Sequence, residues 1–175
     1  MNTLRITQDT DAQDPRKEFD NLGTLYIANN RYFMGDENAE HPNEVDDIAV
    51  ALNVYAYIHS GIVLNTSGFD CQWDSVQAGV IYITKETLIK EYGADTPENR
   101  EKAERVLKAE VETFSQYLSG DVWGFEVIEK HTCDMGHEHE EVIDSCWGFY
   151  GSDPKENGMA DHLEHKLEEY EIEGA

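Results

Sequence analysis

Histidine and cysteine side chains gather in one short stretch of the chain, where they could hold a zinc ion. The stretch contains His131, Cys133, His137 and His139, and Cys146 follows it. Thiolate and imidazole groups are common zinc ligands, but structural zinc sites usually pair their cysteines as Cys-x2-Cys. Met135 stands where the second cysteine of such a pair would be. We therefore predict no bound metal or other cofactor. A metal-binding accessory or regulatory protein that uses residues 131–139 remains an alternative.

Asp70, Cys71 and Asp74 form a second group, which could line the pocket of a small hydrolase. A nucleophilic cysteine needs an adjacent base and an electropositive setting. The two aspartates give the opposite setting, and aspartates at such spacing are common in loops. The sequence also lacks a phosphate-binding glycine loop, a nucleophile elbow and a paired-histidine metalloprotease motif. We predict that the protein is not an enzyme, and the small hydrolase is a second alternative.

Negative charge is the dominant feature of the composition. The 175 residues include 37 Asp and Glu against 13 Lys and Arg, so the formal net charge is −24. This charge argues against direct binding to nucleic acid phosphates or to anionic membranes. It also exceeds the net charge of roughly 2–8 that keeps a small domain soluble. The charge therefore favours a specific use, with adaptation to high salt as the rival explanation.

The acidic residues are concentrated in segments with very few cations. From Tyr32 to Thr84 there are eight acids and no Lys or Arg, and from Glu156 to the end there are seven acids and one Lys. A further seven acids lie between Glu126 and Asp144, with Lys130 as the only cation. The first predicted partner-binding patch consists of Asp36, Glu37, Glu40, Glu44, Asp46 and Asp47. The second consists of Asp161, Glu164, Glu168 and Glu171, which would form a row on one face of a helix.

Hydrophobic periodicity predicts the elements that must position these residues. Strands are expected over residues 23–28, 62–64 and 76–83. An antiparallel pair is expected around Trp123 and Trp147, with Trp123, Phe125 and Val127 facing one way and Trp147 buried. Helices are expected over residues 43–60, 84–93, 96–120 and 159–173. These elements predict an α+β fold with a mostly antiparallel sheet of four or five strands and three or four helices.

The predicted organisation is a single domain with two acidic extensions. Residues 1–18 are polar and are expected to form a flexible acidic N-terminal arm. Residues 19–151 would form the α+β core domain, and residues 152–175 an acidic C-terminal loop and helix. No hydrophobic signal segment and no long apolar run is present, so we expect a cytoplasmic protein that does not engage membranes.

Several stretches of the core resemble one family. Residues 20–24 (Asp-Asn-Leu-Gly-Thr) and 31–36 (Arg-Tyr-Phe-Met-Gly-Asp) resemble the opening of a largely uncharacterised family of small acidic proteins carried by phages and mobile elements. Residues 73–82, 117–125 and 144–151, rich in Trp, Gly and Tyr, are similar to later stretches of that family. The match covers about residues 19–151. The resemblance implies a phage-type setting and no particular activity.

Charge and resemblance together predict an inhibitor. In charge and size the protein resembles DNA-mimicking antirestriction and anti-CRISPR proteins. We expect it to act in the host cytoplasm, where its carboxylates would imitate nucleic acid phosphates. The expected partner is a basic host defence protein that handles nucleic acid, and binding should be fast and sensitive to salt.

Overall fold

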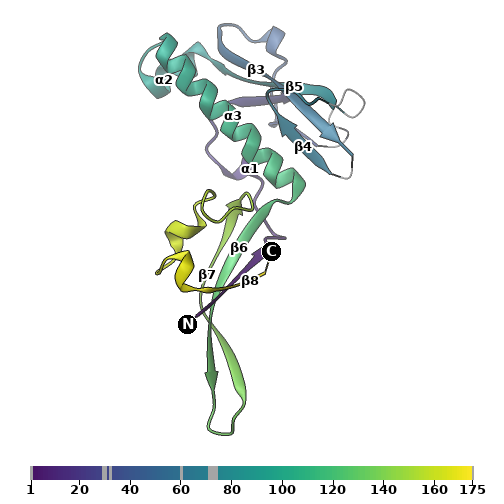
Figure 1. Ribbon diagram of the computed structural model, residues 1–175. Helices are drawn as coiled ribbons and strands as arrows, with labels where there is room; N and C mark the ends of the chain where they lie inside the picture. Colours follow the sequence, from purple (N-terminus) through teal and green to yellow (C-terminus); the bar gives the residue numbers. More distant parts are fainter. Residues whose placement is uncertain (1, 29–30, 32, 60, 71–74, 175) are drawn as a thin grey trace. The chain divides into compact units, whose positions relative to one another are not determined.

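The computed structural model describes residues 2–28, 31, 33–59, 61–70 and 75–174. Within these ranges the chain forms three α-helices, eight strands and three short 3₁₀ helices, labelled η1 to η3 (Figure 1). The chain divides into two compact units. Residues 14–119 form one, which we call the inserted unit, and residues 1–13 and 120–175 form the other, the terminal unit. Helices and strands are largely segregated, so the predicted α+β class is confirmed.

The inserted unit is an antiparallel sheet covered by a long helix. Its strands, in spatial order, are β2 (Thr24–Ile27), β5 (Ser75–Thr84), β3 (Ile48–Ile58) and β4 (Ile62–Asn65). The helices are α1 (Pro15–Glu18), α2 (Lys85–Tyr92) and α3 (Pro97–Ser119), and η1 spans Pro42–Glu44. The apolar stripe of α3 places Leu107, Val111 and Phe114 in one core with Leu25 and Ile81. The strands predicted in this part and the helices predicted at 84–93 and 96–120 are confirmed.

The terminal unit is a second four-stranded sheet, formed from both ends of the chain. Its order is β7 (Glu138–Tyr150), β6 (Val122–Thr132), β1 (Thr3–Gln8) and β8 (Glu171–Gly174), with β8 parallel to β1. The short helices η2 (Met159–His162) and η3 (Leu167–Glu169) bring Met159, Leu167 and Tyr170 into its core. Phe125 and Val127 lie in that core and Trp123 packs against it, so the predicted common direction of these three side chains is confirmed.

The predicted helix over residues 43–60 is wrong, because most of this segment is strand β3. Alternate residues from Val50 to Ile58 pack into the core of the inserted unit, which is the period of a strand. The intervening Tyr55 and Tyr57 obscured this alternation in the sequence. With this strand the described chain has eight strands in two sheets, where one sheet of four or five was expected.

The predicted C-terminal helix over residues 159–173 is also wrong. The segment contains only η2 and η3 before β8 begins at Glu171. The backbone N–H of Glu171 donates to the carbonyl of Asn2 at 3.1 Å, and β8 then pairs with β1. The apolar residues here have helical spacing. Pairing of the segment with β1 and burial of Leu167 and Tyr170 nevertheless stabilise a different conformation.

The N-terminal arm is corrected as well, because residues 3–8 form strand β1 between β6 and β8. The side chain of Leu4 is fully buried and Ile6 is 6% exposed. Both belong to the core of the terminal unit. The alternation Leu4-Arg5-Ile6 is a short strand signal within a segment whose overall polarity suggested a loose arm.

Candidate functional site

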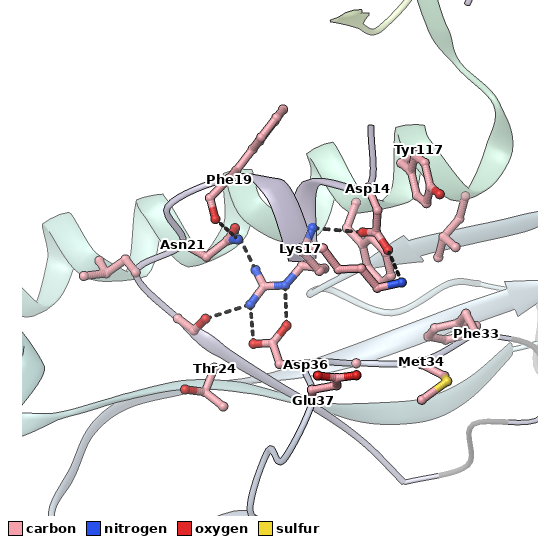
Figure 2. Close-up of a pocket in the computed structure, with 16 residues that line it drawn as sticks. Asp14, Lys17, Phe19, Asn21, Thr24, Phe33, Met34, Asp36, Glu37 and Tyr117 are labelled. Atoms are coloured by element: carbon pink, nitrogen blue, oxygen red, sulfur yellow. Dashed lines mark hydrogen bonds and ion pairs between the residues drawn. The ribbon is translucent and has the colours of Figure 1, made fainter. Parts of the chain in front are cut away.

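A pocket of about 930 Å³ lies in the inserted unit between α1, the loops on both sides of β2, and the C-terminal turns of α3. Figure 2 shows the side chains that line it. Phe33, Phe114, Tyr117 and Leu118 form an apolar part, and Arg16 is surrounded by hydrogen-bond acceptors. The pocket therefore combines an apolar wall with charged side chains.

Arg16 is held by acceptors on every side. Its side chain is 3% exposed. The Nε and Nη2 atoms donate to the two carboxylate oxygens of Asp36 at 2.7 and 2.6 Å, and Nη2 also donates to the Gly23 carbonyl at 2.7 Å. Nη1 donates to Asn21 Oδ1 and to Glu110 Oε2, both at 3.0 Å. All five guanidinium N–H groups thus have a partner.

The carboxylates of this cluster also bind the backbone. Glu110, on α3, accepts the N–H of Leu22 at 2.6 Å and that of Gly23 at 3.2 Å. Asp36 accepts the N–H of Leu25 at 2.8 Å. Burial alone would lower the pKa of Arg16, but its hydrogen bonds and ion pairs with Asp36 and Glu110 raise it above its ordinary value. This ion-pair cluster holds α1 and β2 against α3. Every N–H of Arg16 already has an acceptor, so none is left to bind a substrate.

The first predicted patch is only partly a surface. Asp36 is engaged by Arg16 and its side chain is 21% exposed, so its carboxylate is less available to a partner; its place in a partner-binding surface stays a prediction. Asp47 is exposed but pairs with Lys85, with Oδ1 and Nζ 2.7 Å apart. The remaining members are exposed and lie in the loop and η1 before β3; they are Glu37, Glu40, Glu44 and Asp46.

The second predicted patch is exposed but is not a helical row. Asp161, Glu164, Glu168 and Glu171 all reach the surface of the terminal unit. They are spread over η2, η3, the loop between them and β8, because no α-helix forms there. Glu168 Oε1 lies 3.9 Å from Lys155 Nζ, at the outer limit of an ion pair. The regular spacing expected of this patch is therefore absent.

The acidic residues of strands β6 to β8 form a third acidic group, which neither predicted patch includes. Arg5 on β1 pairs with Glu126, Glu140 and Glu173 at 3.9, 3.1 and 3.2 Å. The hydrogen bond with Glu140 raises the pKa of Arg5, and the same bond lowers the pKa of Glu140. The signal available in the sequence was the run of seven acids between residues 126 and 144.

The histidines of the predicted metal site lie on the β6–β7 hairpin. His131 and His139 face each other across the two strands, with ring centroids 5.4 Å apart and planes at 22°. Cys133 lies at the turn, and Cys146 packs against the core of the terminal unit. Across the ranges that the structure describes, no three His, Cys, Asp or Glu side chains converge into a metal site. The expectation that the hairpin holds no metal stays a prediction.

The hydrolase alternative falls mostly on residues without a described structure. Asp70 is exposed at the end of a loop, whereas Cys71 and Asp74 lie outside the described residues. Among all the residues that the structure describes, no helix is long and apolar enough to cross a membrane.

Comparison with known proteins adds no relative from which a site could be transferred. No family model, no curated protein sequence and no solved structure matches the chain.

Proposed function

We propose that the protein is a non-enzymatic inhibitor that binds a basic, nucleic-acid-handling defence protein of its host. It would compete with nucleic acid for the Lys and Arg side chains of that partner. The observation that carries this proposal is the exposure of carboxylates on the terminal unit. This unit has 18 acidic residues against four basic ones, and 15 of the 18 are exposed.

Such a surface has an energetic cost that a purely structural protein could avoid. Like charges repel one another in the folded state and destabilise it. Among the described residues, the cations of the terminal unit form ion pairs with only four of its carboxylates, namely Glu126, Glu140, Glu168 and Glu173. Most of the negative charge is thus left for an external cation, and arginine side chains bind carboxylates and phosphates with the same forked geometry.

The mechanism would be electrostatic competition. Exposed carboxylates attract a basic groove over a distance of roughly 8–10 Å at physiological ionic strength. This attraction speeds association and makes it sensitive to salt. In the inserted unit the available groups are Glu37, Glu40, Glu44 and Asp46. Among the described residues of the terminal unit, the carboxylates without an ion pair include Asp161, Glu164 and Glu171, together with Glu138, Glu141 and Asp144 of β7, and Glu168 is only 3.9 Å from Lys155.

Displacement of labelled DNA from purified proteins tests the proposal. A guide-loaded CRISPR nuclease and a restriction methyltransferase represent the two classes of expected partner. Fluorescence anisotropy would report DNA release at about 50 and 200 mM salt. We expect release from at least one of them, and weaker release at the higher salt. Release that is independent of salt would contradict phosphate mimicry.

Charge-neutralised variants make this experiment specific. The triple variant Glu164→Gln, Glu168→Gln, Glu171→Gln removes three carboxylates of the terminal unit. The matched control is Glu91→Gln, Glu101→Gln, Glu112→Gln, which removes three exposed carboxylates from α2 and α3. Acidic and basic residues are nearly balanced on α3, so the control should leave DNA release unchanged. Equal effects of both variants would show that only the total charge matters.

A further inference from the structure

Strand β7 is an edge with open hydrogen-bonding capacity. It is 13 residues long, pairs with β6 on one side only, and carries one extra residue at Ile143 and another at Gly148. Within the described ranges, no other strand pairs with its outer side. Residues 138–145 are all exposed. An exposed edge of this length can accept a further strand from another chain.

The hydrogen bonds of β6 show which β7 amides face outward. The N–H of Cys133 donates to His137 at 2.9 Å, and the carbonyl of Asp121 accepts from Gly151 at 2.8 Å. The carbonyl of Val122 instead accepts from Asp9, at the start of the chain, at 2.7 Å. Odd-numbered β6 residues therefore direct their backbone groups to β7, and even-numbered ones to β1.

The register then assigns the outward positions of β7. The residues opposite even-numbered β6 positions are Glu138, Glu140, Val142, Ser145, Trp147 and Tyr150, and the spacing changes where β7 carries an extra residue at Ile143 and at Gly148. Their backbone groups point away from β6 because directly opposed residues in an antiparallel pair either both face the partner strand or both face away. Ser145 agrees with this assignment, since its N–H donates to the Asp144 carboxylate at 2.8 Å.

The side chains of β7 indicate the chemistry of an incoming strand. Glu138, Glu141 and Asp144 supply negative charge along the edge, whereas Glu140 is already paired with Arg5 at 3.1 Å and lies 3.6 Å from Lys130 Nζ. Val142, Ile143 and Trp147 are 51%, 48% and 46% exposed and supply apolar contacts. A second copy of this chain would place carboxylates next to carboxylates, which is unfavourable in cross-strand pairs. A basic strand with interspersed apolar residues fits both properties.

We infer that β7 is a docking edge that adds an extended, basic segment of a partner protein as a fifth strand of the terminal sheet. Outward amides of β7 bind the backbone of the segment. Its Lys or Arg side chains pair with the β7 carboxylates, and its apolar side chains contact Val142 and Trp147. This inference rests on the proposed function, because it names the surface and the conformation through which a basic partner is bound.

Binding of a synthetic peptide tests the inference directly. The probe is an eight-residue peptide that alternates Lys with Val, and its control carries an N-methyl group on every residue. The control keeps the charge and the side chains but cannot donate a backbone hydrogen bond from either edge. Because the control loses several backbone hydrogen bonds at once, we expect it to bind at least about tenfold more weakly. Equal binding of the two peptides, or no binding of either, would overturn the inference.

Protein variants provide the complementary test. Val142→Pro removes an outward N–H while leaving the bonds to β6 in place, and Val142→Ala removes most of the side chain but keeps the N–H. We expect the proline variant to bind the peptide about tenfold more weakly than the alanine variant. If the proline variant fails to fold, the methylated peptide alone decides. Salt-sensitive DNA release without peptide binding would overturn the docking edge but leave the proposed function standing. Peptide binding without DNA release would overturn the proposed function but leave the docking edge standing.

Discussion

Arg16 fastens the irregular segments around β2 to the inserted unit. Its five N–H groups connect α1 to Gly23 and Asn21, to Asp36 in the following loop and to Glu110 on α3. These segments have little regular structure of their own, so their positions depend on this side chain. The charge of Asp36 was visible in the sequence, but its partner lies 20 residues earlier. A count of carboxylates in the sequence cannot separate a carboxylate that is paired within the fold from one that is unpaired on the surface.

Replacing Arg16 should destabilise the inserted unit strongly. In Arg16→Ala the carboxylates of Asp36 and Glu110 lose their cation, and breaking a buried ion pair in this way costs about 3–5 kcal/mol. Arg16→Lys should recover only part of this loss, because an ammonium group cannot form the forked contact with Asp36. Urea unfolding would measure both. The adjacent Lys17 is 73% exposed in its pair with Asp14, so Lys17→Ala should change stability by less than about 1 kcal/mol. Similar losses of unfolding free energy for Arg16→Ala and Lys17→Ala would contradict a structural role of the Arg16 ion-pair cluster.

Trp147 is the clearest residue-level correction. It was expected to be buried, yet it is 46% exposed. Its indole ring lies over Gly124 on β6, where a Cβ atom would overlap the ring. Alternation placed Trp147 on a strand correctly but could not show that the glycine opposite it receives the ring. Truncating Trp147 should therefore cost less than the roughly 3–5 kcal/mol typical of a fully buried Trp.

A double-mutant cycle tests this contact. Gly124→Ala should destabilise the native protein by about 1–3 kcal/mol, because the new methyl group overlaps the indole. In the Trp147→Ala background the same substitution should be neutral or stabilising, because alanine is preferred to glycine in a strand interior. Thermal or urea unfolding of the four proteins would give the coupling energy. Additive effects would mean that the ring does not lie over Gly124.

At the scale of elements, helices and strands were predicted correctly where the apolar residues follow a single clear spacing. The stripe of α3 repeats at helical spacing over six turns, and Thr84 and Gly93 mark the ends of α2. Gly93 has a φ of 85°, which a glycine adopts without strain. Segment 48–58 is apolar on almost every residue, so its period is ambiguous until the sheet exists. The C-terminal segment was misread because its decisive interaction is with β1, more than 160 residues earlier.

Strand β1 should be essential to the terminal unit. It pairs with both β6 and β8, and burial of its Leu4 and Ile6 contributes about 1.5–3 kcal/mol each. Deleting residues 1–8 should make residues 122–150 exchange amide hydrogens rapidly, as measured by mass spectrometry. Deleting residues 171–175 removes an edge strand with exposed side chains and should have a smaller effect. Unchanged amide protection of residues 122–150 after deletion of residues 1–8 would instead support the loose N-terminal arm that the sequence suggested.

The β6–β7 hairpin should fold without metal. His131 and His139 stack on each other, and the hairpin is held by its own backbone register. A structural zinc ion would contribute directly to folding free energy, so its removal would unfold a dependent protein. Thermal melts with and without a strong chelator should therefore superimpose. A clear fall in melting temperature with the chelator would instead favour the metal-binding alternative.

For the whole molecule, the central question is why so much charge of one sign is retained. The net charge was read correctly from composition, but composition cannot show which carboxylates are paired. In the structure Asp36 is paired with Arg16, whereas β7 is an edge strand that carries several exposed carboxylates. Partner binding and adaptation to high salt both explain a charge of −24, but they assign the exposed carboxylates different tasks.

Neutralising exposed carboxylates separates these two explanations. If the charge serves binding, the triple variants Glu164→Gln, Glu168→Gln, Glu171→Gln and Glu37→Gln, Glu40→Gln, Glu44→Gln should keep or raise the melting temperature, because self-repulsion is relieved. At least one of them should associate more slowly with the partner whose DNA is displaced, since electrostatic steering acts mainly on association rates. Stopped-flow association and thermal melts would measure the two effects. If the charge serves salt tolerance, association is unchanged for both variants and stability is lost only in concentrated salt.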